Sequence, residues 1–88
     1  MLKEQSIAFI GKISDLSDDG AYGFITPRTV RRTDGAPLGM KIDDDIFVHR
    51  RSGKNGGIEL RDGMTVSFLL GPNERRGGKM RAFFVEAA

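Results

Sequence analysis

The sequence predicts a single all-β domain of 88 residues, folded as a small barrel of five strands. Five short runs are rich in β-branched and aromatic residues, which favour strands. Polar or glycine-rich turns separate these runs, and no stretch shows the spacing of apolar residues that is typical of an amphipathic helix. Short strands divided by such turns are typical of small barrels.

The first two strands are expected at residues 6–14 and 21–26. In the first, Phe9 and Ile13 stand among further isoleucines, a composition that favours a strand. A polar turn separates the two strands. Pro27 limits the second strand, because proline has no backbone N–H to donate to a sheet ladder.

The remaining strands are expected at residues 45–50, 64–70 and 79–85. Within the strand at residues 64–70, Val66 and Phe68 lie two positions apart and therefore share one face. Glycine-containing loops and turns separate these strands as well. The sequence therefore predicts strands and connecting turns along the whole chain.

The composition excludes several classes of protein. The chain has no cysteine, which excludes disulfides and thiolate metal sites. No apolar stretch approaches the ~20 residues that cross a membrane. The N-terminus also lacks the apolar run of a secretory signal. We therefore expect a cytoplasmic protein with no membrane partner.

Positive charge is clustered, although the net charge is only +2. Each of three basic clusters lies beside a predicted strand end, and we expect contact with phosphate there rather than an ordinary solvated surface. Nine of the fourteen cations are arginine, which stacks on bases and forms forked hydrogen bonds with phosphate. The clusters are Arg28, Arg31 and Arg32, then Arg50, Arg51 and Lys54, and then Arg75, Arg76, Lys79 and Arg81.

Two of the expected strands carry ring-bearing residues two positions apart. Tyr22 and Phe24 form one such pair, and Phe47 and His49 form the other. Because successive side chains of a strand point to opposite faces, the members of each pair share a face. If the two strands pair with these faces matched, four flat rings form one surface on which unpaired bases stack.

The alternative interpretation of alternating aromatic residues is a buried core face. The residues beside the rings argue against it, since Ile25, Ile46 and Val48 are aliphatic and occupy the opposite face. A chain this short builds a single sheet layer that buries one face. We therefore expect the aliphatic residues in the core and the rings outside.

The two ring motifs resemble the paired ribonucleoprotein motifs of bacterial cold-shock proteins and cold-shock domains. The family motifs read roughly Lys-Gly-Tyr/Phe-Gly-Phe-Ile and Asp-Val-Phe-Val-His-Phe. This chain has Gly-Ala-Tyr-Gly-Phe-Ile at residues 20–25 and Asp-Ile-Phe-Val-His-Arg at residues 45–50. The similarity covers most of the chain, with further matches at residues 11–13, 60–68, 71–72 and 82–85.

The resemblance implies a small five-stranded antiparallel OB-type barrel that binds single-stranded RNA or DNA. It implies low sequence specificity, an RNA-chaperone role and no cofactor. We expect bases to stack on the four rings, cations to contact the backbone, and one carboxylate to accept a hydrogen bond from a base edge or to cap a turn. These site residues are Tyr22, Phe24, Phe47 and His49 for stacking, Arg50, Arg51 and Lys12 for the backbone, and Asp45 as the carboxylate.

The chain departs from the family pattern at several positions. After the first strand the family usually has Lys-Trp-Phe, whereas this chain has Ser14, Asp15 and Leu16. Gly20 replaces the lysine that opens the first motif, and Arg50 replaces the ring that follows the histidine. Stacking contributes ~1–3 kcal/mol per base, so lost rings weaken binding. The planar guanidinium of Arg50 partly compensates, because it also stacks.

Residues 27–44 form an insertion where the family has a short loop. One interpretation is a basic β-ribbon arm, in which residues 29–32 pair with residues 40–42 across a turn at residues 33–35. Such an arm lengthens the binding groove. The other interpretation is a surface loop, and the sequence leaves both open.

A function of a different class is a protein-interaction module that kept the barrel and lost most nucleic-acid binding. The missing tryptophan position, Asp15 and the near-neutral net charge favour it. An enzyme is not expected, because the chain has one histidine, no cysteine and no Walker-type phosphate loop. The consecutive carboxylates at residues 43–45 point in different directions, so no metal site is expected, and no small-molecule substrate.

Overall fold

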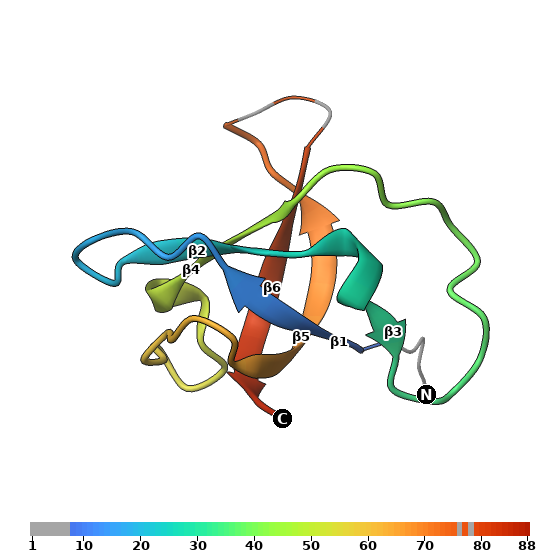
Figure 1. Cartoon of the computed structure of the whole chain (residues 1–88), viewed down its shortest axis with the longest axis horizontal. Coiled ribbons are helices and arrows are strands. Elements are labelled where there is room, and N and C mark those ends of the chain that lie inside the picture. The colour runs from blue at the N-terminus through green and yellow to red at the C-terminus, as the bar shows by residue number, and fades with distance from the viewer. Residues whose placement is uncertain (1–7, 76, 78) are drawn as a thin grey trace.

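Five strands close into a barrel in the computed structural model, which describes residues 8–75, 77 and 79–88 (Figure 1). The strands are ordered β2–β4–β6–β5–β1, and a further pairing of β1 with β2 closes the ring. The predicted all-β barrel is thereby confirmed. Its strands are β1 (Phe9–Ser14), β2 (Tyr22–Ile25), β4 (Ile46–His49), β5 (Thr65–Pro72) and β6 (Met80–Ala87).

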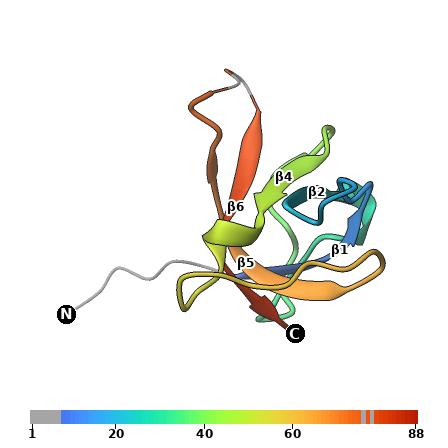
Figure 2. The same cartoon turned by 90° about the vertical axis from the view of Figure 1, so that its left-hand side faces the viewer.

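The observed strands overlap the predicted ones. β4 ends at His49, because the 3-10 turn η2 (Arg50–Ser52) follows it directly. β5 and β6 are the longest strands, and they extend beyond the body of the barrel (Figure 2). Residues 6 and 7 of the first predicted strand lie outside the described residues. In the part of the chain that the structure describes, no helix has the length and apolar character that crossing a membrane requires.

One junction of the ring is parallel, which differs from the antiparallel arrangement that the resemblance implies. β4 and β6 run in the same direction and meet at Phe47 and Arg81. The other four junctions of the ring are antiparallel. A closed ring of five strands cannot alternate direction at every junction, because five is an odd number. The parallel junction is therefore a consequence of closure.

The core lies inside the barrel, on the face of β2 and β4 opposite the ring motifs. Ile25, Ile46 and Val48 are fully buried, as the alternation of the sequence predicts. Burying an aliphatic side chain of this size stabilises a fold by about 1.5–3 kcal/mol, so this face is held inward. The buried apolar residues are Phe9, Ile13, Ile25, Val30, Ile46, Val48, Leu60, Val66, Phe68, Ala82 and Val85.

The first part of the insertion continues the sheet along β1, and the ribbon interpretation is wrong. β3 (Arg31–Arg32) pairs with Phe9 and Ile10 at the start of β1. β2 pairs with the end of β1, along the same edge of that strand. Only the 3-10 turn η1 (Pro27–Thr29) separates β2 from this segment. Val30 explains the pairing, because its side chain is buried in the core and holds the segment against β1.

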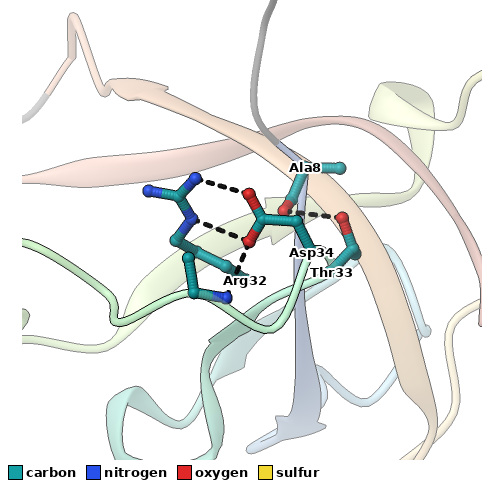
Figure 3. A network of polar contacts seen from close by, with 5 residues as sticks. Ala8, Arg32, Thr33 and Asp34 are labelled. Atoms are coloured by element: carbon teal, nitrogen blue, oxygen red, sulfur yellow. Dashed lines mark hydrogen bonds and ion pairs between the residues drawn. The ribbon is translucent and has the colours of Figure 1, made fainter.

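A polar network fixes the turn that follows β3 (Figure 3). Arg32 donates two hydrogen bonds to the carboxylate of Asp34, and Asp34 also accepts the N–H of Ala36 at 3.0 Å. Thr33 donates from its hydroxyl and its N–H to the carbonyl of Ala8. The hydrogen bonds from Arg32 hold the pKa of Asp34 at about 2. Arg32 is therefore engaged in structure at neutral pH.

Residues 36–44 form an irregular loop that returns to β4 along one side of the barrel (Figure 1). Leu38 and Ile42 pack against the core from this loop. Lys79, just before β6, pairs with Asp44 at 3.1 Å and ties the end of the loop to the barrel. The loop interpretation therefore describes the second part of the insertion.

Candidate nucleic-acid interface

The ring-bearing residues of β2 and β4 lie together on the outside of the barrel. The two strands pair with Tyr22 opposite His49 and with Phe24 opposite Phe47. The centroid of the Phe47 ring lies 5.8 Å from that of Tyr22 and 5.9 Å from that of Phe24. It lies 6.3 Å from the centroid of the His49 ring. We call these four side chains the ring platform, and their predicted clustering is confirmed.

The ring platform faces solvent, so the core-face interpretation is wrong. Tyr22 is 41% exposed, and the other three rings are half-buried against their neighbours. The planes of Phe47 and Tyr22 differ by 32°, and those of Phe47 and His49 by 42°. Phe24 instead meets Phe47 nearly edge-on, at 70°. Three rings therefore present similar faces, and Phe24 forms a border.

His49 contributes a neutral ring at pH 7. Its Nδ1 accepts the N–H of Arg51 at 3.0 Å, which caps the turn η2. Burial lowers the pKa of His49, and the positive charges of Arg51, Arg50 and Arg81 lower it further. Since the ordinary pKa is about 6.5, the imidazole is uncharged at neutral pH and carries its proton on Nε2. A neutral flat ring is suited to stacking.

An open depression beside the ring platform, on the side of β6, gathers positive charge. It has a volume of about 360 Å³, and Arg51, Arg75 and Arg81 line it. Arg51 is the one predicted site residue among these three. Arg76, from the same predicted basic cluster, lies outside the described residues. In proteins that bind single strands, cations beside a stacking surface contact the phosphates.

Arg50 lies at the end of the ring platform that Tyr22 and His49 form. Its N–H donates to the carbonyl of Ala21 at 2.8 Å, beside Tyr22. Hydrogen bonds from the N–H of Ala21 and from Ser17 lower the pKa of Asp19, and the charge of Arg50 lowers it further. The carboxylate of Asp19 is therefore close enough to offset part of the positive charge at this end.

Asp45 and Lys12, which were also predicted as site residues, do not line the depression that holds Arg51. Asp45 is exposed and lines a smaller depression of about 240 Å³ together with Phe24 and Phe47. A carboxylate in this position is within the reach of a base that stacks on these rings. Lys12 is not beside the rings, because it lines a separate depression with Arg28 and Arg31.

β6 adds two side chains that the sequence alone does not assign to the site. The guanidinium carbon of Arg81 lies 5.8 Å from the centre of the Phe47 ring and 4.9 Å from that of Phe83. Its Nη2 donates to the hydroxyl of Ser52 at 2.7 Å. The ring of Phe83 packs against Gly71, where a Cβ would come within 2.5 Å of it. The spacing of Arg81 and Phe83 indicates a shared face, but only barrel closure places that face beside β4.

The β1 side of the ring platform carries hydroxyls instead of a ring. Ser14 is in register with Phe24, and its hydroxyl shares a hydrogen bond of 3.0 Å with that of Thr26. Asp15 is exposed and has a positive φ of 52° at the start of the turn. Ser14 and Asp15 thus lie on the β1 side of the platform, and the additional aromatic and cationic groups of β6 lie on the other side.

Comparison with known proteins assigns no family to this chain. No protein-family model matches it, and no curated protein matches it. The resemblance to cold-shock domains therefore rests on the sequence motifs alone.

Proposed function

We propose that this protein binds single-stranded RNA or DNA by stacking unpaired bases on the ring platform. One observation carries the proposal: two paired strands turn their rings to solvent while the aliphatic residues between them fill the core. Rings held at the surface gain less packing than rings in the core, whereas an unpaired base gains a stacking partner from them. The likeness of the two ring motifs to those of cold-shock domains supports the same function.

The geometry favours a strand that runs across the ring platform. Tyr22, Phe47 and His49 offer successive ring faces, and each stacked base contributes ~1–3 kcal/mol. The phosphates of the strand meet Arg51 and Arg81 in the adjoining depression. Rings do not distinguish donors from acceptors, so binding is low in sequence specificity. Such binding holds strands open, as an RNA chaperone does.

Titration with a fluorescein-labelled oligothymidylate at low salt tests this proposal. We expect the double variant Tyr22→Ala, Phe47→Ala to bind at least about 30-fold more weakly, because two stacking partners are lost. Circular dichroism checks that the variant is folded. Phe84→Ala is the matched control, because Phe84 is a 60% exposed ring that lines a different depression of the barrel.

The intrinsic fluorescence provides an independent reading. Tyr22 is the only tyrosine and the chain has no tryptophan, so quenching by unlabelled oligothymidylate reports contact at the ring platform itself. Two results would overturn the proposal: no binding by the natural protein at low salt, or equal binding by the folded double variant. A protein partner would then be the better interpretation of the exposed rings.

A further inference from the structure

We infer that a second site binds the phosphate backbone of the same strand, on β1 and the first part of the insertion. Lys12, Arg28 and Arg31 line one open depression of about 440 Å³, which we call the basic depression. This inference rests on the proposed function and adds to it a subsite of different chemistry. The remaining lining residues are uncharged: Ile10, Gly11, Thr29 and Thr65.

The fold holds these three cations close together. Arg31 is paired with Ile10 through the β1–β3 ladder, which places it beside β1. The hydroxyl of Thr29 accepts the N–H of Lys12 at 2.9 Å and donates to the carbonyl of Thr26 at 2.6 Å. These hydrogen bonds fix η1 against β1 and keep Arg28 near Lys12. The backbone positions that carry the cations are therefore fixed before any ligand arrives, which lowers the entropy lost on binding.

The charges of the basic depression are not neutralised by the ion pairs of the described residues. Those pairs use Arg32, Lys41, Lys54, Arg61 and Lys79. The two arginines of β3 differ in this respect. Arg32 forms an ion pair with Asp34, whereas its neighbour Arg31 lines the basic depression. Three like charges held together repel one another, and a bound anion relieves that repulsion.

The basic depression continues the path of a strand that leaves the ring platform. Ser14 is in register with Phe24 at the border of the platform. Lys12 lies two residues earlier on the same outer face of β1, which corresponds to about 7 Å along a strand. The hydroxyls of Ser14 and Thr26 lie between the two sites. A nucleic-acid backbone crossing them brings its phosphates to the cations, and no base is read there.

The salt dependence of binding tests this inference. We compare Arg28→Gln, Arg31→Gln with a control of equal charge, Lys41→Gln, Arg61→Gln, whose cations pair with Asp43 and Glu59 outside the basic depression. For an oligothymidylate of about ten nucleotides, each lost phosphate contact lowers the slope of log K against log salt by about 0.7. We expect the first variant to lose about 1.4 from the slope and the control to keep it.

The length of the oligonucleotide separates the two sites. An oligomer of about four nucleotides covers the ring platform alone. It should bind equally to the variant Arg28→Gln, Arg31→Gln and to its control. The single variant Lys12→Gln leaves the insertion intact and should lose about 0.7 from the slope, which guards against misfolding of the double variant. Slopes equal to the control for both variants would overturn the inference while ring-dependent binding stood. No binding by the natural protein would overturn both proposals.

Discussion

The ring platform and the basic depression share the outer surface of one small barrel, yet they differ in the forces they offer. The platform presents three aromatic rings and a neutral imidazole, whereas the depression presents three cations and no ring. Stacking on an uncharged ring releases no counterions, while each phosphate contact does. Stacking is therefore expected to depend on the rings, and salt dependence on the cations of the basic depression and on those beside the platform, so that mutations can separate the two.

The largest effect is expected from removing the centre of the ring platform. Phe47 contacts three other rings and lies beneath Arg81, whereas Tyr22 contacts two rings and is more exposed. Phe47→Ala should weaken oligothymidylate binding by about 1–3 kcal/mol. Tyr22→Ala should weaken it less, because fewer rings depend on it. The check is fluorescence anisotropy on both variants; a larger loss for Tyr22→Ala would place the main stacking contact on Tyr22 rather than on Phe47.

An intermediate effect is expected at Arg81, which both contacts aromatic rings and supplies a positive charge. Arg81→Met keeps an apolar stem between Phe47 and Phe83 but removes the charge. It should weaken binding by about 1 kcal/mol and lower the salt slope by about 0.7. Arg81→Lys should keep the slope and lose only the planar stacking. Equal slopes for Arg81→Met and the natural protein would assign Arg81 to the platform alone.

The smallest effect is expected from the protonation of His49. The folded protein lowers the pKa of His49, so the stability that its neutral form provides is complete above about pH 6.5 and is lost as the pH falls through the folded value. His49→Asn keeps an acceptor for the N–H of Arg51 but does not titrate. The natural protein should therefore lose stability relative to this variant on acidification.

Chemical denaturation of both proteins between about pH 5 and 8 measures this difference. The carboxylates titrate alike in the two proteins, so their contribution cancels. A difference in unfolding free energy that is constant with pH, or that favours the natural protein in acid, would contradict the lowered pKa.

The sequence predicted the features that depend on local alternation. Tyr22 and Phe24 share a face because they are two residues apart, and the same holds for Phe47 and His49. Their solvent exposure followed from the aliphatic residues between them, which lie in the core. The barrel followed from the number of strands and the turns between them. These inferences hold because a strand has a fixed period of two residues.

The features that depend on closure were not predictable from the sequence. Arg81 reaches Phe47 only because the ring of strands brings β6 beside β4. The segment after Pro27 was expected to pair within the insertion, but the burial of Val30 sets β3 against β1 instead. At Phe84 the alternation itself fails, since a register shift between β5 and β6 and a positive φ of 50° turn this ring outward.

The junctions of the barrel are also expected to differ in how easily they open locally, and the parallel junction is the weak one. β4 and β6 are joined by one ladder pair, whereas β2 and β4 are joined by four. A junction with few ladder hydrogen bonds opens at a lower free energy than the rest of a sheet. Phe47 and Arg81 are the residues of this ladder pair, so we expect local opening of the junction to change their separation. We expect the surface to adapt to bases of different size there, while the rest of the barrel stays closed.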